Sequence, residues 1–204
     1  MKKLGIPIVL LLSLLISNCA IFQTFANLSR LKFRLGNVEN LYVEGISVSG
    51  KSRLSDFSAF DIAAVGSSIS RGSLKVSLVL NVEAVNPNDG KGGFPSTSAS
   101  INSFPYRLNI DGNDVITGNI GSPFIIPGTG EKVTIPLSVS TDLLKNVQDK
   151  GYQSLLNLVL KVAGIRAGTN SSSAALYAKP VIGTAIGNIS YPQEIKIISE
   201  QFNQ

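Results

Sequence analysis

The sequence predicts a mainly β domain, an antiparallel sandwich with a helical insertion near residues 142–163. Apolar and polar residues alternate from Leu74 to Ala84 and again from Val133 to Val139. This period of two is typical of strands that rest one face on a core. Between Leu143 and Val162 the apolar residues instead recur at helical spacing, which predicts a helix packed on the sheets.

The first part of the folded domain is predicted to contain two strands and one short helix. Residues 31–35 alternate between apolar and charged side chains, and residues 41–48 form a second β-type segment in which Gly45 is a candidate bulge. Ser55-Asp56 is a candidate N-cap for a helix that begins near Phe57 and ends at Gly66.

The middle of the chain begins with the clearest strand, which runs from Leu74 directly into Asn86-Pro87-Asn88. Proline cannot donate to a ladder and asparagine bonds its own backbone in turns, so the chain must leave the sheet at this motif. We interpret the motif as structural and not as a binding site. A loop over 90–98 follows, and strands at 99–110 and 115–120 are predicted to form a hairpin around Asp111-Gly112-Asn113-Asp114.

The last third combines strands with the helical segment. Pro136 within the strand at 133–139 indicates an edge strand or a bulge. Thr141 is the predicted N-cap of two consecutive helices or one bent helix, whose apolar stripes end at Gly151 and Gly164. Residues 174–178 and 189–198 read as the final two strands, joined by the glycine-rich residues 183–187.

Cys19 is the only cysteine, and it follows a short apolar run that begins after Lys2 and Lys3. A positive start, an apolar run too short to span a bilayer and a small-residue exit describe an export signal. Ile16-Ser17-Asn18-Cys19 is similar to a lipobox, although Asn18 departs from the usual small residue before the cysteine. We therefore expect cleavage before Cys19 and acylation of its thiol. An ordinary signal peptide with an incidental cysteine is the alternative.

These signals divide the chain into four parts. Residues 1–18 are the predicted lipoprotein signal peptide, 19–30 the lipidated N-terminus and tether, 31–198 a single domain, and 199–204 a C-terminal tail. Removal of the signal peptide takes two lysines from a net charge of +5, and the remaining excess is too small and dispersed to predict nucleic-acid binding.

Composition argues against an enzyme. The chain has no histidine, so it has no Ser–His or Cys–His nucleophilic pair and none of the usual transition-metal sites. Lipidation of Cys19 would remove the last thiol. Asp111, Asn113 and Asp114 could hold calcium, but a polar hairpin explains them better. We expect no catalytic residue, no metal site and no cofactor.

The strand that ends in Asn86-Pro87-Asn88 resembles the late embryogenesis abundant type 2 family, also called the WHy domain. The resemblance includes the hairpin at Tyr106–Val115 and the Ile135-Pro136-Leu137 step before a helix, and it covers about residues 31–198. It implies an antiparallel β-sandwich of the fibronectin type III or immunoglobulin kind, and a protective role during water stress. The signal peptide and lipobox lie outside the family pattern and imply a bacterial version.

We therefore expect a monomer held by Cys19 in the bacterial cell envelope, at the outer membrane, facing either the periplasm or the surface. Its expected partners are the membrane and client or host proteins. Two other roles stay open: a surface-exposed binding module of the adhesin kind, and a carrier of an apolar ligand. The architecture alone does not choose among them.

Overall fold

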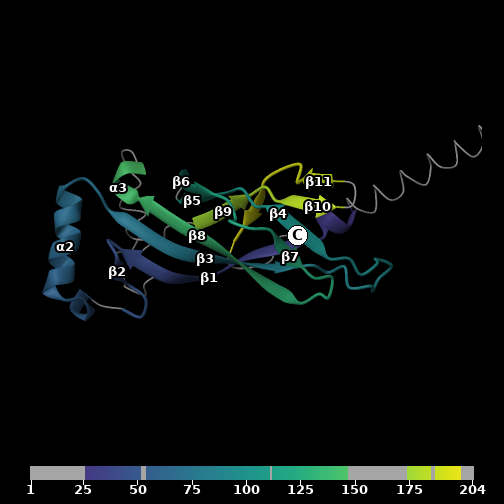
Figure 1. Cartoon of the computed structure of the whole chain (residues 1–204), viewed down its shortest axis with the longest axis horizontal. Coiled ribbons are helices and arrows are strands. Elements are labelled where there is room, and N and C mark those ends of the chain that lie inside the picture. The colour runs from purple at the N-terminus through teal and green to yellow at the C-terminus, as the bar shows by residue number, and fades with distance from the viewer. Residues whose placement is uncertain (1–25, 52–53, 111, 147–173, 185–186, 199–204) are drawn as a thin grey trace, which may run out of the picture.

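The computed structural model describes residues 26–51, 54–110, 112–146, 174–184 and 187–198. The described part is mainly β, with three four-stranded antiparallel sheets (Figure 1). The first sheet has the order β2-β1-β3-β8. Its strands are β1 (Lys32–Val43), β2 (Ile46–Ser47), β3 (Lys75–Val85) and β8 (Lys132–Asp142).

β3 is the central strand of this sheet and matches the sequence prediction closely. Eleven consecutive residues of β3 pair with β8, from Lys75 opposite Asp142 to Val85 opposite Lys132. Its inward face carries Val76, Leu80, Val82 and Ala84, all buried. β8 is an edge strand, as Pro136 predicts, because a residue without an N–H costs least where one side of the strand is unpaired.

The other two sheets share two chain segments: β4 and β5 are consecutive strands that lie one in each sheet, and so are β9 and β10. One has the order β11-β10-β4-β7 and the other β12-β9-β5-β6. The strands are β4 (Ala99–Ser103), β5 (Tyr106–Ile110), β6 (Asn113–Gly118), β7 (Phe124–Ile126), β9 (Ala174–Ala178), β10 (Val181–Thr184), β11 (Gly187–Ser190) and β12 (Ile195–Ile197). β4 pairs with β10 and β5 with β9. Between the two sheets, the Lys179 N–H donates to the Pro105 carbonyl at 2.9 Å.

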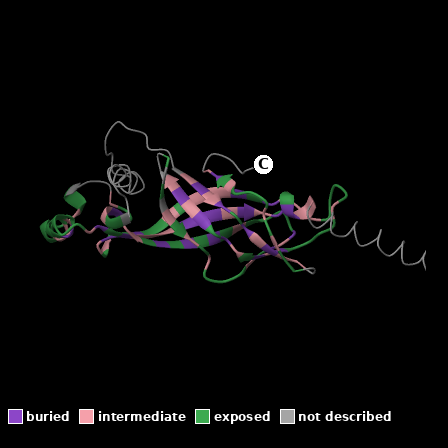
Figure 2. Cartoon of the chain, turned by 90° about the horizontal axis from the view of Figure 1, so that it is seen from above, coloured by how far each residue is buried: buried purple, intermediate pink, exposed green. Residues whose placement is uncertain are grey.

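One hydrophobic core lies between the first sheet and the other two. Phe33 of β1 and Phe104, which follows β4, are both fully buried, with ring centroids 5.6 Å apart. The Leu35 N–H donates to the Ile198 carbonyl at 3.0 Å, which links β1 to the end of β12. Figure 2 shows the buried residues gathered along these strands.

The helix α2 (Ala59–Ser70) stands at one end of the molecule, beyond the strands. Ser58 is its N-cap: the Ser58 hydroxyl accepts from the Asp61 N–H at 3.0 Å and the Asp61 carboxylate accepts from the Ser58 N–H at 3.0 Å. This capping box satisfies two backbone donors at the start of the helix. Residues 26–29, where the described structure begins, lie at the opposite end with β10 and β11.

Several predicted boundaries are wrong. α2 begins after Ser58 and not at Ser55-Asp56, which lies in the short 3-10 helix η1 (Leu54–Asp56), and α2 runs through Gly66. Gly45 is not a bulge: Glu44 and Gly45 both have positive φ, 52° and 80°, and form the turn between β1 and β2. Positive φ at both central residues gives the turn a twist that matches its strands.

Strand lengths also differ from the prediction. Proline and bulges interrupt the pairing between strands, and the local pattern does not show which strands pair. The predicted segment 31–35 and the start of the segment 41–48 lie in one long strand, β1, whose register shifts twice against β3, and the rest of the second segment forms the turn and β2. The predicted strand 99–110 is two strands, separated at Phe104-Pro105. The predicted strand 174–178 is confirmed as β9, whereas the predicted strand 189–198 is divided between β11 and β12. β7 and β10 were not predicted.

The predicted helical insertion is only partly within the described residues. Thr141 is not an N-cap, because β8 continues through Asp142 and pairs there with β3. A short helix follows, α3 (Leu143–Asn146), and Leu143 is buried in the core. The rest of the insertion, with its stripes ending at Gly151 and Gly164, lies outside the described residues.

Candidate functional site

Asn86, at the end of β3, is the centre of a buried polar network. Its side chain is 0% exposed, and its amide nitrogen donates to the carbonyls of Thr97 and Ile126 at 2.7 and 3.2 Å. Its amide oxygen accepts from both the backbone and the side-chain nitrogen of Asn88, at 3.2 and 2.9 Å. The side chain of one asparagine therefore forms hydrogen bonds with backbone groups of the loop before β4, the end of β7 and the turn after β3.

Asn88 extends this network to the beginning of the described chain. Its side-chain nitrogen also donates to the Asn27 carbonyl at 2.9 Å, and its oxygen accepts from the Arg30 guanidinium at 3.1 Å. Arg30 in turn stacks on Phe94, with its guanidinium carbon 3.7 Å from the ring centroid. The motif thus joins segments that are far apart in the sequence.

Gly128 lies against this network at a distance only glycine permits. A Cβ at this position would come within 2.6 Å of the Asn88 carbonyl oxygen and 2.7 Å of the Thr97 nitrogen. The Ser96 hydroxyl donates to the Gly128 carbonyl at 2.8 Å. We call this assembly of Asn27, Arg30, Asn86, Asn88, Thr97 and Gly128 the N-terminal pole.

The network offers little chemistry to a ligand. Neutral amides are neither nucleophiles nor acid–base groups near neutral pH, and Asn86 and Asn88 are engaged with backbone groups and shielded from solvent. Pro87 lies between them and contributes the turn, with its carbonyl accepting from the Asp89 N–H at 3.0 Å. The structural role of Asn86-Pro87-Asn88 stays a prediction, which a substitution tests below.

The carboxylate of Glu83 is held by two cations. Glu83 of β3 accepts from Arg34 of β1 and from Lys132 of β8, the latter at 2.7 Å. These hydrogen bonds, first that of Lys132 and then that of Arg34, lower the pKa of Glu83. This set ties together three strands of one sheet and has the geometry of a structural ion pair.

In the hairpin that was considered as a calcium site, the Asp114 carboxylate is likewise held by a cation and by hydrogen bonds. Asp114 accepts from Asn109 at 2.8 Å and from Arg107 at 2.6 Å, and Arg107 also donates to Glu194 at 2.8 Å. Asp111 lies outside the described residues. Among the residues that the structure describes, no three side chains of the types Asp, Glu, His and Cys gather to hold a metal.

The outward face of α2 carries no charged residue and combines apolar side chains with small ones, among them the exposed Ser70. The stripe facing the body is formed by Asp61, Ala64, Val65 and Ser68, all partly or fully buried. Phe60 is 84% exposed on one flank, and Ile62 and Ile69, one heptad apart on the other, are each 45% exposed. Small residues lie between the flanks, at Ala59, Ala63, Gly66 and Ser70, and all four are exposed.

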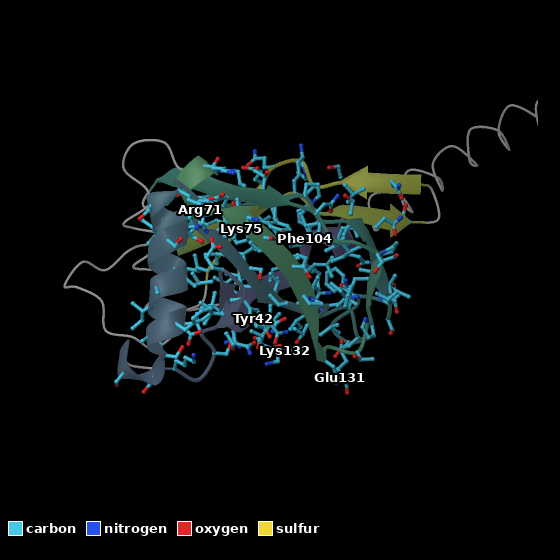
Figure 3. All side chains as sticks on the ribbon, turned by 60° about the vertical axis from the view of Figure 1, so that its left-hand side comes forward. Tyr42, Arg71, Lys75, Phe104, Glu131 and Lys132 are labelled. Carbon is cyan, nitrogen blue, oxygen red and sulfur yellow. The ribbon has the colours of Figure 1, made fainter. Side chains whose placement is uncertain are left out.

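This surface was not predicted from the sequence, although the near absence of charge in the helical segment indicates it. Asp61 is the only charged residue between Ala59 and Ser70, and it serves the capping box. A surface helix of a soluble domain normally carries polar residues on the side away from the core. Figure 3 looks onto this end of the molecule, where Arg71 ends the helix and Lys75 begins β3.

A second apolar feature lies at the N-terminal end. A pocket of about 500 Å³ opens between residues 26–29 and the segment after β10. Its lining includes Ala26 and Leu28 on one side and Ile189, Tyr191 and Pro192 on the other. The Tyr191 hydroxyl donates to the Leu28 carbonyl at 2.5 Å and holds the two sides together.

Cys19, the predicted lipid anchor, lies outside the described residues. Leu28, which the sequence places in the tether, is buried against the core, so the folded part extends at least to residue 26. No helix in the described part of the chain is long and apolar enough to cross a bilayer.

Comparison with known proteins adds little to these observations. No family model matches the chain, and no curated protein matches it. A solved structure, described as a crystal structure of a protein from Archaeoglobus fulgidus, is similar over 82% of this chain and 98% of its own, with 11% identity and a TM-score of 0.35.

Proposed function

We propose that this chain is a non-enzymatic, lipid-anchored protein of the bacterial cell envelope that protects partly unfolded client proteins during water loss. The observation that carries the proposal is the position of the uncharged apolar surface of α2. It lies at the end of the molecule opposite residues 26–29, where the chain from Cys19 enters the fold. A protein held at one end would present this surface away from the membrane.

The shape and chemistry of α2 fit an extended or helical apolar segment of a client. The small residues Ala59, Ala63 and Gly66 let another backbone approach closely, while Phe60 and Ile62 flank it with apolar side chains. A surface without charge does not select among partners by electrostatic complementarity. Such a surface suits apolar segments of many sequences, as a protective role requires.

We also propose that the resemblance to the late embryogenesis abundant type 2 family reflects a shared fold. That fold would be a sandwich of the fibronectin type III or immunoglobulin kind. It is supported by the order of the parts along the chain: β3 followed directly by Asn86, the hairpin of β5 and β6, and β8 with Pro136 before α3. It is also supported by the single core between the first sheet and the other two, with Phe33 facing Phe104.

The client-binding part is tested by drying and rehydrating a labile enzyme, such as lactate dehydrogenase, with the protein and its variants. We expect the double substitution Phe60→Ser and Ile62→Ser to reduce recovered enzyme activity at least two-fold relative to the unsubstituted chain. Ile125→Ser is the matched control, because Ile125 is 65% exposed on β7, away from α2. Equal protection by all three proteins would contradict the role of α2.

The anchor is tested separately by phase partitioning. We expect Cys19→Ala to move the protein from the detergent phase to the aqueous phase, because two or three acyl chains hold a protein firmly in a membrane and none remain in the variant. The intact mass of the unsubstituted protein provides the second measurement. An unmodified Cys19 would disprove the lipid anchor and leave the client-binding proposal to its own test.

A further inference from the structure

The pocket beside Ala26 has the size and lining of a site for an apolar ligand. Its volume of about 500 Å³ lies within the range of small-molecule sites, which are mostly apolar with few polar groups. Leu28, one of its lining residues, is buried in the core, and Ile189 and Tyr191 pack partly against the core. This part of the lining therefore belongs to the folded domain.

The polar groups around the pocket do not offer a partner for a charged headgroup. Among the described residues that line it, none is charged. The Tyr191 hydroxyl is used by the Leu28 carbonyl, and burial raises its pKa, so it stays neutral. The Ser29 hydroxyl donates to the Ala26 carbonyl at 2.9 Å. Arg30, the next cation along the chain, is directed to Asn88 and Phe94.

These contacts favour an alkyl chain whose carboxyl group is not free. A free fatty acid would bring a carboxylate that needs a cation or several donors. The described lining supplies no cation, and beyond the hydroxyls of Ser29 and Tyr191 its only side-chain donor is Ser190. An acyl chain joined through an ester or amide has no such charge. The lipid expected on Cys19 has this chemistry.

The position of the pocket also fits an acyl chain attached to Cys19. Ala26 lines the pocket, and Cys19 lies seven positions before it in the sequence. Seven residues span about 25 Å when fully extended and less in any folded form. An acyl chain on Cys19 is thus within reach of the pocket without any change in the described fold.

We propose that this pocket holds one acyl chain of the lipid on Cys19. The inference rests on the lipid anchor proposed above. With one chain withdrawn into the protein, the remaining acyl chains still anchor it, and residues 26–29 and the pocket are held close to the membrane surface.

Photocrosslinking in cells identifies the occupant directly. We would place p-benzoylphenylalanine at Tyr191 in the full-length protein, irradiate, and analyse the crosslinked peptides by mass spectrometry. The same amino acid at Ile189 provides a second position that keeps the Tyr191 hydrogen bond, and at Phe60 it provides a control at the far end. We expect a crosslink between the pocket peptide and the lipidated peptide that begins at Cys19.

A matched pair of substitutions tests the pocket itself. Ala26→Trp fills it and should reduce the crosslink yield at least five-fold, whereas Ala59→Trp, on the exposed start of α2, should leave it unchanged. Crosslinks to membrane phospholipid, or no lipid crosslink from either pocket position, would overturn the proposal. The mass of the N-terminal peptide shows separately whether Cys19 is lipidated, so a failure of the anchor is distinguished from a failure of the pocket.

Discussion

The two ends of the molecule satisfy their polar groups in opposite ways. At the N-terminal pole, Asn86 and Asn88 bond backbone groups from segments up to 61 positions away. At the other end, α2 satisfies its first turn with the neighbouring Ser58 and Asp61, and it leaves Phe60 in solvent. One β-strand, β3, with 11 residues and a length of about 35 Å, separates the two.

This difference indicates which end can change without loss of the fold. A network that joins distant segments is cooperative, and each of its members supports several others. A helix capped by its own neighbours depends on few tertiary contacts. We therefore expect substitutions at the N-terminal pole to unfold the domain and substitutions on the surface of α2 to be tolerated, which leaves α2 free for binding.

The largest effect is expected from Asn86→Ala. The substitution removes the side chain that donates to the carbonyls of Thr97 and Ile126 and that accepts from the Asn88 backbone N–H. Unsatisfied buried groups cost about 1–3 kcal/mol each, so we expect the free energy of unfolding to fall by about 3 kcal/mol. Denaturant unfolding measures it. Asn102→Ala is the control, since Asn102 bonds Asn188 on the surface, and an equal loss in both variants would contradict the structural role of Asn86.

A pair of glycine substitutions contrasts the two ends with the same chemical change. Gly128→Ala forces a methyl group against the Asn88 and Thr97 backbones, and we expect it to lower the free energy of unfolding by about 2 kcal/mol. Gly66→Ala, in α2, meets no atom within 4 Å and should raise stability by about 0.5–1 kcal/mol, because alanine favours the helix. Thermal melts of the two variants should move in opposite directions, and a shift of the same sign would break the comparison.

A smaller effect is expected from acid at the junction between α2 and β3. Asp142 accepts from the Ser73 hydroxyl at 2.6 Å and from the Leu74 N–H at 2.9 Å. The Ser73 bond is the main cause that lowers the pKa of Asp142 to about 2. Because the folded pKa lies below the unfolded value, the stabilisation is present above about pH 4 and is lost as the pH falls through 2.

We expect this loss to be on the order of 1 kcal/mol by pH 2. The measurement is the unfolding free energy against pH for the unsubstituted chain and for Asp142→Asn. The variant should be less stable at pH 7 and show a shallower decline between pH 4 and pH 2. Parallel curves would show that Asp142 does not carry this part of the acid response.

Prediction from the sequence succeeded where a single segment contains the whole signal. The alternation of β3 and β8, the hairpin around residues 111–114 and the turn at Asn86 each depend on neighbouring residues. Prediction failed where the pairing between distant strands decides where a strand begins or ends. Phe104-Pro105 breaks a strand because β4 and β5 pair with different partners, and Thr141 stays in β8 because β3 continues opposite it.

The proposed functional surfaces show the same limit. The apolar run before Cys19, from which an export signal is predicted, is readable in the sequence because such a signal is a local pattern. The exposed surface of α2 was missed because apolar residues such as Phe60 and Ile62 are normally assigned to a core. The pocket was missed because its two sides, at Ala26 and Tyr191, come from opposite ends of the chain.

The sequence alone determined that this chain is mainly β, where its central strands run and where the chain leaves the sheet after β3. Period-two alternation and turn residues act over a few positions, so they are visible without a structure. Only the tertiary structure decided which carbonyls Asn86 and Asn88 satisfy, which end of the molecule presents apolar side chains and where a pocket remains. These features depend on contacts between segments far apart in the chain, and no local pattern specifies such contacts.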